Sequence, residues 1–250
     1  MTRHINRRRT TLALAAALIA LVAPAISQGA AAAPDHRRAR WAPTIEASWE
    51  MNEPWGATTM VDSGPHGFDI PFDQAGLDSG FEYDGATGYR WPRRNPTNPP
   101  ASPERVIVIP DAPELDPGSG TFTVEIRYRT KEKFGNITQK GQARTRGGQW
   151  KIQNPGGRPS CLFKGSIQRR SVRSQVPLND NQWHTLHCVK TPRQVELWVD
   201  GVRVGRKRGN TGTVDNRFPM TIGGKIDCDQ IRVTCDYFSG EIDYVRLSHG

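Results

Sequence analysis

The sequence lacks any apolar run long enough to cross a bilayer as a helix. The apolar segment near the N-terminus, Leu12–Val22, has 11 residues, whereas a membrane-spanning helix needs about 20. Helical periodicity is also scarce, since no segment predicts a helix of more than two turns. Familiar catalytic motifs are missing too: the sequence has no G-x-S-x-G, no cysteine in a nucleophile context and no phosphate-binding glycine pattern before a helix. The sequence therefore contains no recognisable motif of a serine or cysteine hydrolase or of a nucleotide-binding site.

The N-terminus has the features of a secretory signal. Basic residues at positions 3–9 precede the apolar run, and Ala30–Ala33 offers the small residues of a cleavage site. We therefore predict a signal peptide over residues 1–33, a flexible leader over 34–43 and a soluble mature protein outside the cytoplasm. Export by the Sec route is favoured. A Tat signal built on Arg8-Arg9 and an uncleaved anchor are the alternatives.

The net charge gives little support for a nucleic-acid partner. The chain has 34 Lys and Arg against 25 Asp and Glu, but the signal peptide removes four arginines, so the mature charge is 30 − 25 = +5. The cluster Arg206-Lys207-Arg208 is predicted to lie in a loop after a hairpin. A solvated charged surface is the plain interpretation of this cluster, and contact with a polyanion is the alternative. No specific nucleic acid is expected.

Residues 181–204 give the clearest structural signal. The apolar residues of Gln194–Val199 alternate with polar residues and Trp198, so this strand has a buried face and an outer face. Asp200-Gly201 then favours a type I′ turn, because both central residues of that turn need positive φ. A second clean alternation spans Phe122–Tyr128, and turn residues separate further short strand-like runs. The pattern predicts an all-β protein.

Several motifs follow one another along the chain in an order that matches a known family. They are the segment from Asp84-Gly85 to Gly118, the strand Phe122–Tyr128, the W-H-x-h-x-C and h-x-L-W-V-D-G patterns of Trp183–Gly201, Pro219–Lys225 and Asp236–Arg246. Together they resemble the laminin G-like (LamG) domains of the concanavalin A-like lectin/glucanase superfamily. The resemblance implies a two-sheet antiparallel β-sandwich of the jelly-roll type over residues 44–250. It also implies a binding module, and it makes calcium possible, since some LamG domains hold calcium in rim loops.

The four cysteines follow a secretory signal, which favours two disulfides. Three connectivities are open, although Cys228 and Cys235 flank a short loop that one bridge could close. Zinc is disfavoured because no C-x2-C pair occurs. The LamG resemblance favours the pairing Cys161–Cys188 with Cys228–Cys235.

Glu241 and Asp243 are the residues that most suggest an enzyme. On a strand they share one face, and retaining glycosidases need two carboxyl groups about 5–5.5 Å apart. Superfamily glycosidases carry E-x-D-x-E or E-x-D-x-x-E on one strand, but here Val245-Arg246 occupies the places of the last glutamate. We therefore predict no catalytic residue. His184 and His187 point to opposite faces of a strand and cannot share a metal ion.

Trp198 is the leading candidate for ligand binding. It faces away from the apolar set of its strand, where an indole can stack on a sugar; a covering loop is the alternative. Trp91 and Trp150 are further candidates with the same alternative, whereas Trp183 is predicted to lie in the core. The sequence thus predicts a secreted, non-catalytic LamG-like module for a glycan or an extracellular or cell-wall partner. The alternatives are a glycoside hydrolase of the same superfamily and a purely structural envelope protein.

Overall fold

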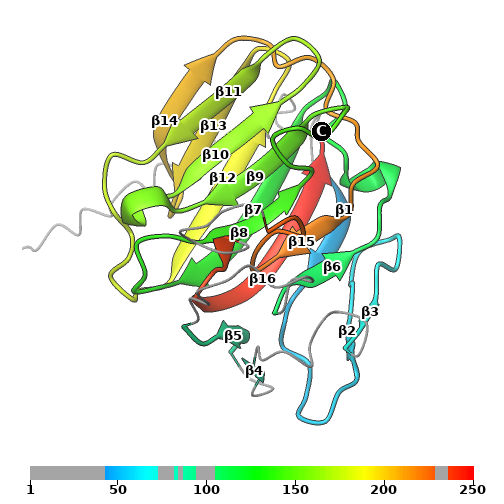
Figure 1. Ribbon diagram of the computed structural model, residues 1–250, viewed down its shortest axis with the longest axis vertical. Helices are drawn as coiled ribbons and strands as arrows, with labels where there is room; N and C mark the ends of the chain where they lie inside the picture. Colours follow the sequence, from blue (N-terminus) through cyan, green and yellow to red (C-terminus); the bar gives the residue numbers. More distant parts are fainter. Residues whose placement is uncertain (1–42, 73–81, 84–86, 94–104, 229–235) are drawn as a thin grey trace, which may run out of the picture. The chain divides into compact units, whose positions relative to one another are not determined.

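In the computed structural model, the chain forms two antiparallel β-sheets packed face to face (Figure 1). The structure describes residues 43–72, 82–83, 87–93, 105–228 and 236–250. The all-β, two-sheet sandwich predicted from the sequence is confirmed. The predicted signal peptide and leader lie outside the described residues, so both stay predictions.

The larger sheet has eight strands. Seven follow the order β14-β13-β12-β7-β16-β5-β4, and β1 pairs with the second half of β16. Their bounds are β14 Val202–Arg208, β13 Gln194–Val199, β12 His184–Lys190, β7 Phe122–Arg129, β16 Gly240–His249, β5 Tyr89–Trp91, β4 Glu82–Tyr83 and β1 Thr44–Trp49. The C-terminal strand β16 therefore lies inside the sheet, between β7 on one side and β5 and β1 on the other.

The smaller sheet has six strands in the order β11-β10-β9-β8-β15-β6. Their bounds are β11 Arg169–Arg173, β10 Ser160–Lys164, β9 Gln149–Gln153, β8 Asn136–Lys140, β15 Met220–Ile222 and β6 Ile107–Ile109. A small pair, β2 (Thr59–Met60) and β3 (Ile70–Pro71), and two 3-10 turns, Pro113–Leu115 and Pro155–Gly157, complete the described elements. Within these ranges, no helix has the length and apolarity that crossing a membrane requires.

The core between the sheets is built by residue-by-residue alternation. In β7, Phe122, Val124, Ile126 and Tyr128 are fully buried, while the residues between them are half-buried. The smaller sheet contributes Trp150 and other apolar side chains to the same cluster. Because burial of each large apolar side chain contributes about 1.5–3 kcal/mol, this shared core is what holds the two sheets together.

A disulfide crosses the core. It joins Cys161 of β10 in the smaller sheet to Cys188 of β12 in the larger sheet, with the Cα atoms 5.6 Å apart. This part of the predicted pairing is confirmed. Cys228 is not a free thiol, but its predicted partner, Cys235, lies outside the described residues.

The hairpin predicted at Asp200-Gly201 is present between β13 and β14. Both turn residues have positive φ, 48° and 78°, as a type I′ turn requires. The predicted loop at Arg206-Lys207-Arg208 is wrong, because β14 continues to Arg208 and pairs there with Gln194. Backbone pairing with β13 keeps this polar segment extended, although it has no apolar alternation that would reveal a strand.

Two lysines are fully buried near the ends of strands. The ammonium of Lys140 lies 2.7 Å from Asp111 Oδ1 and 2.8 Å from Asp116 Oδ1, so two carboxylates offset its charge. Lys190 instead donates a hydrogen bond to the carbonyl oxygen of Gly120 at 2.9 Å. Burial lowers the pKa of Lys190 to about 8.

Candidate functional site

The outer face of the larger sheet brings together most of the residues that the sequence singled out. Directly paired residues on neighbouring antiparallel strands share a face. Trp198 pairs with His187, His187 pairs with Glu125, and Glu125 pairs with Arg246. These four side chains therefore form one row across β13, β12, β7 and β16, on the face turned away from the core.

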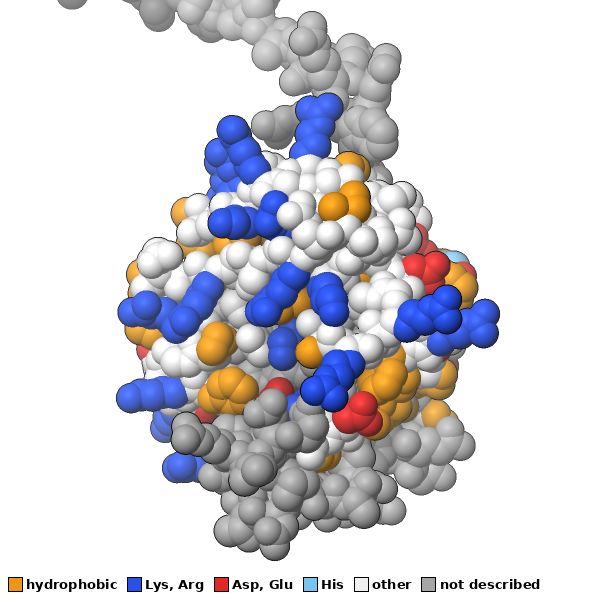
Figure 2. All heavy atoms as spheres, turned by 45° about the horizontal axis from the view of Figure 1, so that its top comes forward, with side chains coloured by type: hydrophobic (Ala, Val, Ile, Leu, Met, Phe, Trp, Pro, Cys, Tyr) orange, Lys and Arg blue, Asp and Glu red, His pale blue; other side chains and the backbone are white. Residues whose placement is uncertain are grey.

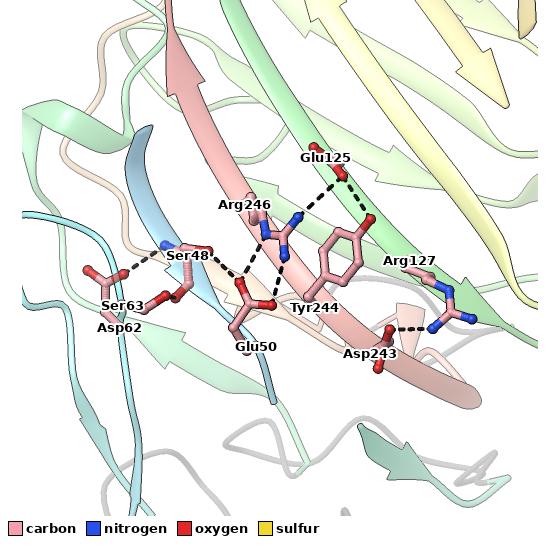
Figure 3. A network of polar contacts seen from close by, with 9 residues as sticks. All are labelled: Ser48, Glu50, Asp62, Ser63, Glu125, Arg127, Asp243, Tyr244 and Arg246. Carbon is pink, nitrogen blue, oxygen red and sulfur yellow. Dashed lines mark hydrogen bonds and ion pairs between the residues drawn. The ribbon is translucent and has the colours of Figure 1, made fainter. Parts of the chain in front are cut away.

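Arg246 is the centre of a charged network on this face (Figure 3). Its guanidinium donates two hydrogen bonds to Glu50, at 2.9 and 2.8 Å, and lies 3.6 Å from Glu125 Oε1. Glu125 also accepts a hydrogen bond from the hydroxyl of Tyr244 at 2.7 Å and lies 3.5 Å from Nε2 of His187. One arginine thus neutralises two carboxylates, one just after β1 and one in β7.

The network keeps both carboxylates ionised. Hydrogen bonds from Arg246 lower the pKa of Glu50. The hydrogen bond with His187, followed by that from Tyr244, lowers the pKa of Glu125. Burial, with the hydrogen bond to Glu125, raises the pKa of Tyr244 to about 12. A general acid must hold a proton near neutral pH, so neither glutamate has the state that such a role needs.

Glu241 and Asp243 also face outward, and each has its own arginine. Nη2 of Arg129 lies 2.6 Å from Glu241, and Nη1 of Arg127 lies 2.5 Å from Asp243. A β-bulge at Asp243 interrupts the alternation of β16. The bulge explains why Tyr244, the next residue, also reaches the outer face (Figure 3).

The structure shows where Val245 and Arg246, which replace the last glutamate of the glycosidase patterns, lie. Val245 is fully buried in the core, and Arg246 points outward into the charged network. A cation therefore stands on the outer face three residues after Asp243. Glu241 and Asp243 of the E-x-D motif do both lie on the outer face, but each carboxylate forms an ion pair with an arginine.

The prediction that Trp183 lies in the core is wrong. The ring is only half-buried, and the guanidinium carbons of Arg127 and Arg129 lie 4.8 and 4.7 Å from its centroid. Trp183 stands just before β12, beside the charged end of β7. Cation–π contact with two arginines gives the indole a stabilising environment outside the core.

Trp198 lies on the outer face as predicted and is half-buried. Its indole N–H donates to Glu196 Oε2 at 3.1 Å, and the guanidinium of Arg203 lies 5.7 Å from the ring centroid. Trp91 and Trp150 are fully buried, which confirms the alternative in which the rest of the chain covers them. Trp198 is thus the one of these three with ring surface open to solvent.

The two histidines lie on opposite faces of β12, as predicted. His184 Nδ1 lies 2.7 Å from Asp200 and Nε2 lies 3.2 Å from Asp180, while His187 faces Glu125. In the part of the chain that the structure describes, no group of three or more His, Cys, Asp or Glu side chains is placed to hold a metal ion.

A cleft at one end of the outer face was not anticipated from the sequence. It has a volume of about 740 Å³ and is bordered by β4, β5, the end of β7 and the start of β16. Trp55 lies on its rim and is 81% exposed. Three ion pairs line the cleft, Arg90–Glu82 at 3.3 Å, Arg93–Glu132 at 3.6 Å and Arg129–Glu241 at 2.6 Å.

Trp55 could not be identified from periodicity because it lies in the loop between β1 and β2. Its neighbours Pro54 and Gly56 mark a turn, and a turn has no strand or helix periodicity that would assign the indole to a face. In the sequence, only the tripeptide Pro54-Trp55-Gly56, which places an indole in a turn, could have indicated this cleft.

Comparison with known proteins identifies the family. A family model described as the concanavalin A-like lectin/glucanases superfamily matches residues 102–250, and the chain belongs to this superfamily. The sequence resemblance is thereby confirmed. A search of curated proteins found no match.

Solved structures show the same fold at low sequence identity. Domains LG4-5 of the mouse laminin alpha1 chain are 19% identical, with a TM-score of 0.43, over 57% of this chain and 38% of that one. Domain 4 of AbnA, a GH43 extracellular arabinanase from Geobacillus stearothermophilus solved with arabinotriose, is 12% identical, with a TM-score of 0.50, over 83% of this chain and 93% of that one. The chain thus spans well under half of the laminin structure.

Proposed function

We propose that the chain is a secreted, non-catalytic LamG-like module that binds a glycan in the cleft beside Trp55. The observation that carries this proposal is an indole that is 81% exposed on the rim of a cleft of about 740 Å³. A large exposed aromatic ring is a recurrent mark of a binding surface, and its flat face packs well on the C–H face of a sugar.

The polar lining of the cleft supports a neutral or weakly charged glycan. Its three arginines and three glutamates are engaged with one another. Such pairs still present donors and acceptors to hydroxyl groups, while their net charge is close to zero. A strongly charged ligand would gain little attraction there.

The ion pairs also support the non-catalytic part of the proposal. Glu241, one of the three glutamates that line the cleft, is held by Arg129 at 2.6 Å. The nearby glutamates Glu50 and Glu125 have lowered pKa values because of their hydrogen-bonding partners. Retaining glycosidases need one carboxyl group that stays protonated until it donates its proton, and the lowered pKa values of Glu50 and Glu125 do not suit that role.

Trp198 is proposed as a second contact for the same ligand class. Its ring faces outward on β13, but its N–H is already bonded to Glu196. On the same sheet, β12 lies between its strand and β7, whose end borders the cleft. The two tryptophans therefore mark two ends of the outer face and can be tested against each other.

A glycan array probed with the full chain tests the proposal. It should include arabino-oligosaccharides, because the arabinanase domain was solved with arabinotriose. We expect binding of at least one neutral glycan, loss of that binding in Trp55→Ala, and retention in Ile167→Ala, a control at another exposed apolar residue. Absence of any bound glycan would contradict the proposal. New reducing ends that appear with wild type and not with Glu241→Gln would show a hydrolase instead.

Secretion is proposed on the predicted signal peptide together with the extracellular relatives and the disulfide. N-terminal sequencing of the exported protein should show a chain that begins near Pro34. A chain that begins at Met1 in the exported fraction would contradict cleavage.

A further inference from the structure

A second cleft lies at one end of the smaller sheet, at the loop that joins β8 to β9. It has a volume of about 820 Å³ and shares no lining residue with the cleft beside Trp55. A volume of this size is within the range of about 300–1,000 Å³ that is usual for small-molecule sites. The lining comes from the β8–β9 loop and from one residue on each side of β15, and it includes Gln142, Arg144, Thr145, Arg146, Phe218 and Asp227.

The β8–β9 loop is fixed by hydrogen bonds within it and to neighbouring segments. The side chain of Gln142 accepts a hydrogen bond from the backbone N–H of Asp227 at 2.8 Å and donates one to the carbonyl oxygen of Asp227 at 3.3 Å. The N–H of Gln142 donates to Thr145 Oγ1 at 2.8 Å, and the N–H of Thr145 donates to the carbonyl oxygen of Gln142 at 3.0 Å. At the end of the loop, the N–H of Asp215 donates to the carbonyl oxygen of Gly147 at 3.0 Å. The two arginines of the loop therefore stand on a backbone that is held in place from both sides.

Phe218 is tied to the same loop through Asn216. The backbone N–H of Phe218 donates to Asn216 Oδ1 at 2.9 Å, and the side-chain amide of Asn216 donates to the carbonyl oxygen of Gly148 at 3.2 Å. The buried ammonium of Lys140, which two carboxylates already bind, also donates to the carbonyl oxygen of Asn216. Phe218 itself is half-buried, so it offers apolar surface to a ligand in the cleft.

The two arginines of this cleft have no acidic partner. Arg144 and Arg146 are exposed, and neither guanidinium binds a carboxylate within the described residues. With one carboxylate in the lining, that of Asp227, the formal charge of the lining is 2 − 1 = +1. In the cleft beside Trp55, by contrast, three arginines are paired with three glutamates. The second cleft therefore attracts an anion, and a single negative charge balances its lining.

Exposed basic side chains do not by themselves mark a site on this protein. On the face shown in Figure 2, Lys and Arg side chains are spread widely, a distribution that solubility alone explains. Arg144 and Arg146 differ because they share one fixed loop, one cleft and an aromatic neighbour, Phe218. The aromatic side chain adds apolar surface that a simple inorganic ion cannot use.

The chemistry of the lining favours a carboxylate on an apolar or aromatic body. A guanidinium binds a carboxylate through two parallel hydrogen bonds, and the ring of Phe218 packs well against a flat apolar group. Asp227 disfavours a phosphate monoester, because such a group carries a charge of about −1.5 to −2 near neutral pH. A monoanion with an apolar body is thus the best match to both the charge and the surface of the cleft.

We propose that the cleft at the β8–β9 loop binds a small monocarboxylate with an apolar or aromatic body. The inference does not depend on the glycan proposed for the cleft beside Trp55, since the two clefts share no residue.

The test follows the amide resonances of the isotope-labelled full chain during titration with naphthoate, its neutral analogue naphthalenemethanol, acetate and naphthyl phosphate. The salt concentration is about 150 mM, at which exposed charges are screened. The cleft variants are Arg144→Ser/Arg146→Ser and Phe218→Ala. The control variant, Lys133→Ser/Arg193→Ser, removes the same charge from exposed residues that line neither cleft. Melting temperatures establish that the variants fold, and Phe218→Ser/Arg146→Ser is not needed if Phe218→Ala melts as wild type does.

We expect naphthoate to bind with a Kd of about 1 mM or tighter, as its size allows, and to shift the amides of residues 142–146 and of Phe218. Arg144→Ser/Arg146→Ser should weaken binding by about tenfold or more, and Phe218→Ala by about threefold or more, whereas the control should stay within about twofold of wild type. Naphthalenemethanol and acetate should each bind at least about tenfold more weakly than naphthoate, because each lacks one half of the recognised chemistry.

Trp55→Ala should bind naphthoate as wild type does, so this site is tested separately from the glycan site. Equal weakening by the control variant, equal affinity for the neutral analogue or tighter binding of naphthyl phosphate would each overturn the proposal. Amide shifts confined to other residues, or no binding of naphthoate at about 10 mM, would overturn it as well.

Discussion

Arg246 shows how a single residue sets the chemistry of the outer face. It stands where the glycosidase pattern would place an acid, and it holds Glu50 with two hydrogen bonds of 2.9 and 2.8 Å. The pKa of Glu50 is below its ordinary value of 4.5 chiefly because of Arg246, and that of Glu125 is below 4.5 chiefly because of the hydrogen bond with His187. Their ionised forms are therefore favoured by folding, and the stability they contribute is present above pH 4.5 and lost as the pH falls through their lowered pKa values.

Replacement of Arg246 should expose this contribution. We expect Arg246→Met to lower the free energy of unfolding at pH 7 by about 1–2 kcal/mol, because two half-buried carboxylates lose a charged hydrogen-bond donor. The difference from wild type should shrink when urea unfolding is repeated below pH 4. Arg90→Met, which breaks an exposed pair with Glu82 at 3.3 Å, should change stability little at either pH. A stability difference between wild type and Arg246→Met that grows as the pH falls would contradict this role of Arg246.

Lys190 gives a second pH dependence, of the same sign but in the alkaline range. Burial lowers its pKa from 10.5 to about 8, so the unfolded chain binds the proton more tightly than the folded chain does. Stability should therefore rise between pH 8 and pH 10, by about 2 kcal/mol from this group. Urea unfolding at the two pH values should show this rise in wild type and in Lys133→Met, an exposed control, but not in Lys190→Met. The same rise in Lys190→Met would assign it to another group.

At the scale of elements, the alternation of apolar and polar residues predicted most of the strands and their buried faces. The patterns of Phe122–Tyr128 and Gln194–Val199 correctly gave two strands with one buried face, and Asp200-Gly201 correctly gave the turn. Pairing register could not be read from one sequence, because it depends on contacts between strands far apart in the chain. For that reason the pairing of Glu125 with Arg246 was not foreseen.

The errors have the same origin. The sequence predicts Trp183 in the core, whereas in the structure two arginines of the neighbouring strand β7 lie over its ring. Arg206-Lys207-Arg208 was placed in a loop because the segment has no apolar alternation, whereas pairing with β13 makes it a strand. In each case a tertiary contact overrides the local signal.

The disulfide between β10 and β12 should be a major element-scale constraint on the unfolded chain. The sequence separation of its cysteines is 27, and closure of a loop of this length stabilises by about 3 kcal/mol in the chain-entropy model. We expect Cys161→Ala/Cys188→Ala to lower the free energy of unfolding by about that amount in urea titrations. Cys228→Ala/Cys235→Ala, which removes the shorter bridge predicted from the sequence, serves as the comparison and should cost less. An unchanged urea midpoint in the first variant would contradict this role.

At the scale of the whole molecule, the sandwich separates two chemically different surfaces. The cleft beside β4 and β5 has an exposed Trp55 and charges that are paired. The strands β11 and β14 instead carry exposed basic residues, and only Arg203 among these is paired with a carboxylate, Glu196, within the described residues. The cleft and this edge therefore differ in charge.

The most direct test of the central claim is calorimetric titration of the best-binding glycan from the array into wild type, Trp55→Ala and Trp198→Ala. Stacking on a ring of this size contributes about 1–3 kcal/mol, so Trp55→Ala should weaken binding by about tenfold or more. Its melting temperature should stay unchanged, because the side chain is 81% exposed. Wild-type affinity in Trp55→Ala would contradict the account, and a tenfold loss confined to Trp198→Ala would move the site to β13.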